Sequence, residues 1–109
     1  MMTFPDSFLT LKAVLARLSA PASEQIKYLT SLGVADLADE LALEFDDIYR
    51  PRARELEHVS PDAAAACREL DRLLSGDQLG WRFVDLDSAR WDEVRAAAAT
   101  ANASLARAG

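Results

Sequence analysis

Apolar residues of this chain recur at steps of three and four, and this spacing constrains the fold more than any other feature of the sequence. It is clearest in the rows Phe8, Leu11, Leu15, Leu18 and Trp91, Val94, Ala98, Ala101, Leu105. Side chains at these intervals lie on one face of an α-helix. Residues 76–87 depart from the pattern and hold too few large apolar side chains for a paired strand, so we expect an extended connection over the core there. The sequence therefore predicts an all-α protein.

Capping residues mark where the helices begin and end. Ser60 as N-cap, Pro61 at the first helical position and Gly76 after the last turn delimit the clearest helix. Ser23 and Gly33 bracket a short helix. A further helix is predicted behind Pro5, and an acidic one over about residues 35–49 with Asp36 as N-cap. Pro51 disfavours helical geometry at the residue before it, so a separate short helix is predicted over residues 52–58. The last predicted helix begins after the candidate caps Asp87 and Ser88. We expect a compact single-domain helical bundle, residues 1–109, of four main helices plus one or two short ones, with residues 1–4 and 106–109 frayed.

The negative charge is concentrated in one helix-sized segment. Eighteen acidic and twelve basic residues give a net charge of −6. Six of the acids lie in residues 34–49, which hold no Lys or Arg, so the rest of the chain carries twelve acids and twelve bases. Nucleic acids and anionic membranes require a basic stripe on the proteins that bind them. We therefore expect neither nucleic acid nor membrane as a partner.

The chain has one cysteine, Cys67, so it forms no intrachain disulfide, which favours a reducing compartment. The N-terminal residues MMTFPDSFL lack the basic start and long apolar run of a signal peptide. No apolar stretch approaches the roughly 20 residues that span a bilayer. We expect a cytoplasmic protein.

The acidic stretch, residues 36–50, divides into two faces when it is wound as a helix. The apolar face contains Leu37, Ala38, Leu41, Ala42, Phe45, Ile48 and Tyr49. The acids form a stripe opposite, with Leu43 projecting from its middle. Four like-charge pairs at helical contact spacing oppose the helix by about 0.2–0.5 kcal/mol each. An apolar centre with a charged rim is the anatomy of a protein interface. A solvated face, or a Leu43 packed within its own domain, is the alternative.

A metal site is a second interpretation of the same acids. Glu44-x-x-Asp47 resembles the second half of the ExxE…ExxD arrangement in all-α nucleotide pyrophosphohydrolases of the MazG type, whose carboxylates hold magnesium. The resemblance implies a Mg-dependent hydrolase that uses Glu44 and Asp47. The neighbouring acidic pairs, Glu55 with Glu57 and Glu69 with Asp71, do not have the spacing that this family needs.

The other residue types that carry chemistry are sparse. His58 is the only histidine, so one chain cannot build a multi-histidine metal site. Cys67 lies on an alanine-rich helix face, where an inert buried thiol is expected. There is no glycine-rich phosphate loop or nucleophile motif. We expect no catalytic residue, no metal and no cofactor.

The segments SLGVADLADELALEFDDIY and ELDRLLSG, with a tryptophan-containing final helix, resemble a group of short, acidic, helical proteins from actinobacteria, and the excess of arginine over lysine fits such a source. The resemblance implies a stand-alone bundle and no site residue. We expect a non-enzymatic module that presents the acidic helix to a basic protein partner, as an immunity or antitoxin-like protein would. A homodimer or a purely structural bundle is the alternative. The predicted partner-binding residues are Asp36, Asp39, Glu40, Leu43, Glu44 and Asp47.

Overall fold

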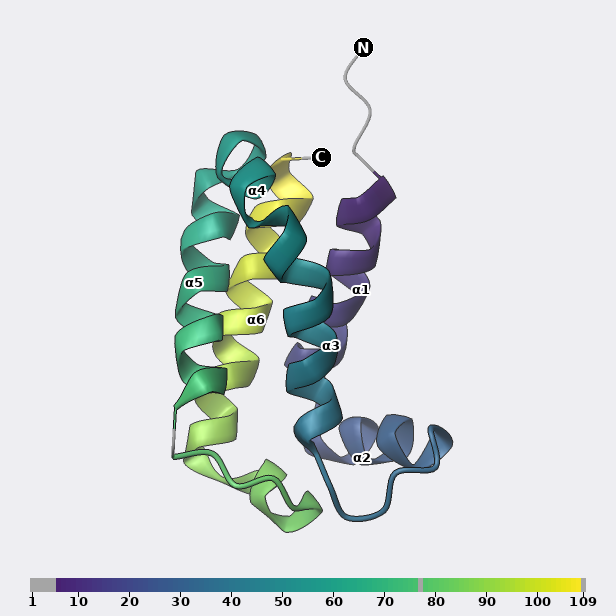
Figure 1. The fold of residues 1–109 in the computed structure, drawn as a ribbon. Helices are drawn as coiled ribbons and strands as arrows, with labels where there is room; N and C mark the ends of the chain where they lie inside the picture. Colours follow the sequence, from purple (N-terminus) through teal and green to yellow (C-terminus); the bar gives the residue numbers. More distant parts are fainter. Residues whose placement is uncertain (1–5, 77, 109) are drawn as a thin grey trace.

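The computed structural model describes residues 6–76 and 78–108, apart from the side chains of residues 6 and 7. This part of the chain forms six α-helices and two short 3₁₀ helices and contains no strand, which confirms the predicted all-α fold (Figure 1). In chain order the elements are α1 (Asp6–Ser19), α2 (Ala22–Ser31), α3 (Asp39–Tyr49), η1 (Arg50–Arg52), α4 (Ala53–Val59), α5 (Pro61–Ser75), η2 (Phe83–Asp87) and α6 (Ala89–Ala108).

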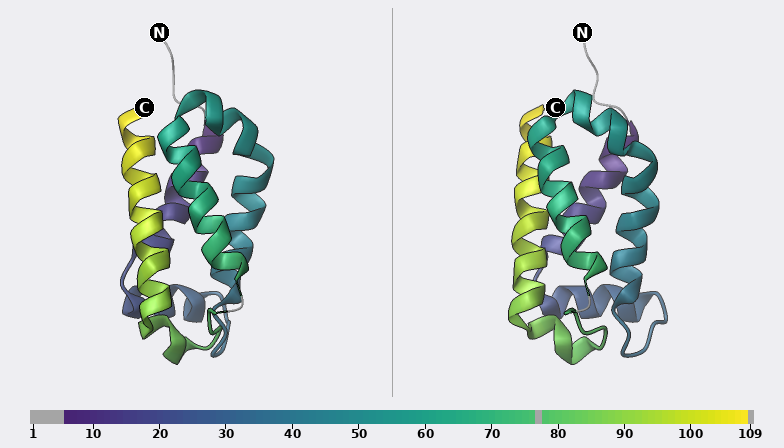
Figure 2. Two further views of the ribbon diagram at one scale, coloured as in Figure 1. Left: turned by 90° about the vertical axis from the view of Figure 1, so that its left-hand side faces the viewer. Right: turned by 60° about the vertical axis from the view of Figure 1, so that its left-hand side comes forward.

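Four of the helices, α1, α3, α5 and α6, run along the length of an elongated bundle (Figures 1 and 2). α6 packs along both α5 and α1, and α1 also packs on α3. The short helix α2 lies across one end, while α4 turns the chain between α3 and α5 at the other end (Figure 2). Four main helices with two short ones match the predicted architecture.

The two apolar rows that suggested the fold meet in the core. Phe8, Leu11 and Leu15 on α1 are completely buried, as are Trp91 and Leu105 on α6. Because helical spacing placed each row on one face, the two faces can pack together and exclude water. α6 extends to Ala108, so residues 106–108, which were expected to fray, are helical, whereas residues 1–4 and 109 lie outside the described part of the chain.

Helix α5 begins as its sequence predicts. The hydroxyl of Ser60 accepts a hydrogen bond from the Ala63 amide at 3.2 Å, and Pro61 occupies the first turn. Gly33, with φ +80°, follows α2 in the left-handed conformation expected of a glycine there. The prediction that Ser23 is the N-cap is wrong, because α2 already begins at Ala22. Pro21 is the N-cap, and its carbonyl accepts hydrogen bonds from the amides of Glu24 and Gln25.

The connection between α5 and α6 is not simply extended, contrary to the sequence expectation. Residues 83–87 form η2, because the Asp85 side chain accepts the Arg82 amide at 3.0 Å and bends the backbone. Leu86 is thereby buried. The indole N–H of Trp91 donates to the Gly80 carbonyl at 2.9 Å, and the Trp81 ring meets the Trp91 ring edge-on with 5.8 Å between centroids. The connection thus closes the end of the bundle near α2.

Candidate binding surface on α3

Asp36 lies outside the acidic helix. α3 begins at Asp39, and Asp36 precedes it with φ +53°, so the prediction that Asp36 is the N-cap and part of the stripe is wrong. Its carboxylate instead accepts hydrogen bonds from the Arg82 guanidinium at 2.6 and 2.9 Å and from the Phe83 amide at 3.0 Å. These bonds, with Arg82 first, hold the pKa of Asp36 below its ordinary value. Asp36 therefore fastens the loop before α3 to the segment before η2.

Leu37, which shares this loop, was expected on the apolar core face, and that prediction is also wrong. Its side chain is 46% exposed, because the chain reaches helical geometry only at Asp39 and Leu37 does not follow the winding of α3. The core face of α3 is formed by Leu41, Phe45 and Tyr49, all buried. The Phe45 and Tyr49 rings stack with 4.9 Å between centroids.

Glu44 belongs to the interior side of the acidic stripe. Arg17 on α1 donates to one of its carboxylate oxygens at 2.8 Å, and the Tyr28 hydroxyl on α2 donates to the other. The Arg17 guanidinium also lies 3.9 Å from the centre of the Tyr28 ring, a cation–π contact. With its side chain 22% exposed, Glu44 joins three helices and uses both carboxylate oxygens within the fold. Its role as a partner-binding residue stays a prediction that these contacts do not favour.

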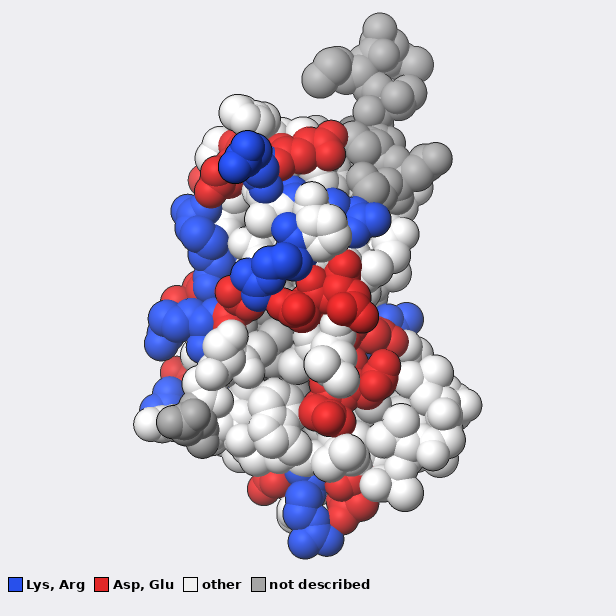
Figure 3. Space-filling view, viewed as in Figure 1, with Lys and Arg blue, Asp and Glu red and all other residues white. Residues whose placement is uncertain are grey.

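Three other carboxylates of α3 are those of Asp39, Glu40 and Asp47; Asp47 is exposed, whereas Asp39 and Glu40 are partly buried. Within the described part of the chain, none of the three forms an ion pair with a Lys or Arg. Asp46 differs, because it pairs with Arg50 at 2.6 Å, and Arg50 also bridges to Asp71 on α5 at 2.8 Å. Figure 3 shows acidic side chains following α3 down this face, with uncharged surface between them.

Leu43 lies at the centre of this exposed face. It is 51% exposed, so about half of its surface is open to a partner. The four positions that neighbour it along the helix, three and four residues away in each direction, are all acidic: Asp39, Glu40, Asp46 and Asp47. We call Leu43 with Asp39, Glu40 and Asp47 the α3 surface. It presents one apolar side chain within a ring of negative charge.

The electrostatic cost of the acids is smaller in the folded protein than the sequence suggests. Two of the four predicted like-charge pairs involve Asp36, which is not in the helix. The other two involve Glu44, whose charge is offset by Arg17. A penalty of about 0.2–0.5 kcal/mol per pair is thus largely absent. The fold tolerates these acids, so their presence alone does not indicate a partner; the exposed Leu43 among them does.

The acids do not converge on a metal-binding geometry in the described residues. No group of three or more His, Cys, Asp or Glu side chains there is placed to hold an ion. Glu44, one of the two residues of the ExxD motif, already has Arg17 and Tyr28 as partners. His58 is exposed in the last turn of α4. Cys67 is buried in the core, and this burial raises the pKa of its thiol to about 12, so the reactive thiolate is strongly disfavoured.

The residues that bind Asp36 and Glu44 could not be identified from the sequence. Arg17, Tyr28 and Arg82 lie 27, 16 and 46 residues from their acidic partners. Gln25 was also overlooked as a structural residue. It is completely buried, its amide donates to the carbonyls of Arg17 and Leu18, and it accepts from Arg95 at 2.9 Å. A polar residue in a short amphipathic helix carries no local signal of such contacts.

The chain matches no protein-family model, and comparison with curated proteins and with solved structures finds no significant match. Among the helices that the structure describes, none is both long and apolar enough to cross a membrane. The resemblance to actinobacterial helical proteins stays a prediction.

Proposed function

We propose that this chain is a cytoplasmic, non-enzymatic protein-binding module that uses the α3 surface to bind a basic protein. The observation that carries the proposal is the half-exposed Leu43 with an acid at each of its four helical neighbours. Protein interfaces typically combine a buried apolar anchor with a polar rim, and the anchor supplies most of the affinity. The partner is accordingly expected to offer an apolar pocket edged by Lys or Arg.

Charge gives the second part of the proposal. Asp39, Glu40 and Asp47 have no basic partner among the described residues, so their field extends into solvent. Complementary charge speeds association and suppresses acidic competitors. An immunity or antitoxin-like protein that blocks a basic nuclease is the most concrete version, because carboxylates can occupy positions that bind substrate phosphates.

Affinity capture from a lysate of the source cells, with Leu43→Asp compared to the unmodified protein, tests the apolar anchor. Aspartate keeps the surface acidic, so a loss of binding reports the missing apolar contact. Leu9→Asp is the matched control, because Leu9 is 53% exposed on α1. We expect a basic protein to be retained by the unmodified chain and by Leu9→Asp, and lost with Leu43→Asp. Retention by all three proteins would contradict the proposal.

Two further measurements complete the test. Retention should weaken as salt is raised, because exposed charges are screened beyond about 10 Å at 0.1 M. Glu40→Gln with Asp47→Asn should reduce this salt dependence. If the unmodified chain is a dimer that Leu43→Asp converts to monomer, the α3 surface is a self-contact and the proposal of a basic partner is wrong.

A further inference from the structure

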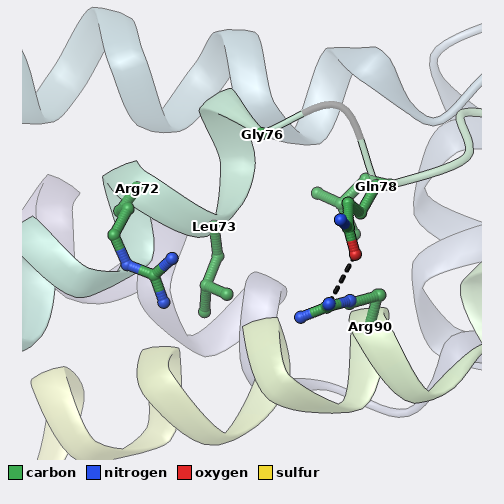
Figure 4. Close-up of a pocket in the computed structure, with 6 residues that line it drawn as sticks. Arg72, Leu73, Gly76, Gln78 and Arg90 are labelled. Carbon is green, nitrogen blue, oxygen red and sulfur yellow. Dashed lines mark hydrogen bonds between the residues drawn. The ribbon is translucent and has the colours of Figure 1, made fainter.

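A pocket lies between the end of α5 and the start of α6, away from the residues of the α3 surface. It has a volume of about 280 Å³ and is lined by Arg72, Leu73, Gly76, Gln78, Leu79 and Arg90. Figure 4 shows the guanidinium groups of Arg72 and Arg90 on opposite sides of the Leu73 side chain, one from each helix. The pocket thus combines two cations, an amide and apolar side chains.

Each guanidinium is only partly engaged by its neighbours. Arg72 donates to Glu69 through Nε and Nη2, and Arg90 donates through Nη1 to Glu93 and through Nη2 to the Gln78 side chain. Among the contacts within the described residues, Nη1 of Arg72 and Nε of Arg90 have no acceptor. A guanidinium carries five N–H donors, so both arginines keep capacity for another oxygen ligand.

The existing carboxylate partners are exchangeable. The side chains of Glu69 and Glu93 are 50% and 52% exposed, and exposed ion pairs contribute little to stability. The pKa of Arg72 is raised, mainly by its hydrogen bond with Glu69 and to a smaller degree by the charge of Glu93. Glu93 therefore acts on both arginines of the pocket, and a carboxylate is already the kind of group that they hold.

We infer that this pocket binds a small organic anion, in which a carboxylate or phosphate group contacts Arg72 and Arg90 and a small apolar body lies on Leu73 and Leu79. Paired guanidinium donors match the oxygens of such groups. The cavity volume of about 280 Å³ is near the lower end of the roughly 300–1,000 Å³ typical of ligand sites, which favours a small ligand. The site shares no residue with the α3 surface, so anion binding there does not depend on the proposed function.

Titration of the full chain with sodium isobutyrate, acetate and inorganic phosphate, followed by ¹H–¹⁵N NMR, tests the inference. We expect saturable shifts of the Gln78 side-chain amide, the Gly76 amide and the Nε–H groups of Arg72 and Arg90. Isobutyrate should bind more tightly than acetate if Leu73 and Leu79 contact its methyl groups. Tighter binding of phosphate would support the same site and identify phosphate as the preferred anionic group. Equal affinity for isobutyrate and acetate would overturn the apolar part of the inference.

Variants separate this site from general attraction of anions to arginine. Arg90→Gln and Arg72→Gln should each weaken isobutyrate binding about tenfold, since each removes hydrogen bonds to a charged group. Glu93→Gln should strengthen it by removing the competing carboxylate. Arg54→Gln is the control, because Arg54 is exposed on α4 outside the pocket. Circular dichroism verifies that each variant is folded. Shifts that stay linear with anion concentration, or that survive both pocket substitutions, would overturn the inference.

Discussion

At the scale of single residues, the carboxylate side chains of one acidic stretch have different roles. Asp36 fixes a loop, Glu44 joins three helices, and Glu40 forms no ion pair within the described residues. The difference depends on whether a basic side chain from elsewhere in the fold reaches the carboxylate. Sequence position along the helix does not determine this, because the arginines involved come from α1 and from the segment before η2.

Asp36 provides a prediction at this scale. Asp36→Ala should lower the melting temperature, because it removes the acceptor for Arg82 and Phe83 at a residue with φ +53°. Asp36→Asn should lower it less, since asparagine tolerates the left-handed conformation and keeps one oxygen for the Phe83 amide. Thermal unfolding by circular dichroism near neutral pH measures both. Equal melting temperatures for all three proteins would show that the contact does not stabilise the fold.

The pH dependence of this contact follows from the direction of the shift. The pKa of Asp36 is lower in the folded chain than its ordinary value of 3.8. The unfolded chain therefore takes up the proton first as the pH falls, and the contribution of Asp36 is present above about pH 4 and lost below it. The melting temperatures of the unmodified protein and Asp36→Asn should converge in acid.

At the scale of elements, α3 has a bound side and a free side, and the glutamates at positions 40 and 44 form a matched pair. Glu44→Gln should reduce the free energy of unfolding by about 1 kcal/mol, because it weakens the bonds to Arg17 and Tyr28. Glu40→Gln should change it by less than about 0.5 kcal/mol, because Glu40, although partly buried, forms no ion pair or hydrogen bond through its side chain within the described residues. Urea unfolding measures both, and a loss with Glu40→Gln as large as that with Glu44→Gln would contradict the division of α3 into two sides.

Elements also show where sequence prediction was sufficient. Helix α5 carries its own boundary signals in Ser60, Pro61 and Gly76, and its observed limits agree with them. The N-cap of α3 was misplaced by two residues, at Asp36 and not Ala38, because Asp36 resembles an N-cap but its carboxylate binds Arg82. A helix cap can be recognised from the residues next to it in the sequence, whereas a hydrogen bond to a residue far along the chain cannot.

At the scale of the whole molecule, one continuous core connects all four long helices. Buried residues from α1, α3, α5 and α6 form a single apolar cluster that includes Leu86 and Trp91 at one end. Such a core favours all-or-none unfolding, with no stable partial structure. Helicity and tryptophan fluorescence should therefore report the same urea midpoint, although both tryptophans lie in or beside the α5–α6 connection.

Leu41→Ala provides the variant for this prediction. Leu41 is 1% exposed on α3, and truncating such a leucine costs about 2–5 kcal/mol. Both probes should shift to lower urea by the same amount. A fluorescence midpoint that stays unchanged while helicity is lost earlier would show that α3 unfolds separately from the rest of the bundle.

The sequence by itself determined that this protein is an all-α bundle with its core on particular helix faces. Helical periodicity is a local property, and apolar burial follows directly from it. Only the tertiary structure decided which acids are free, that Leu43 is exposed, and that Arg72 and Arg90 face one pocket. These features depend on contacts between residues far apart in the chain, and such contacts exist only once the helices have packed.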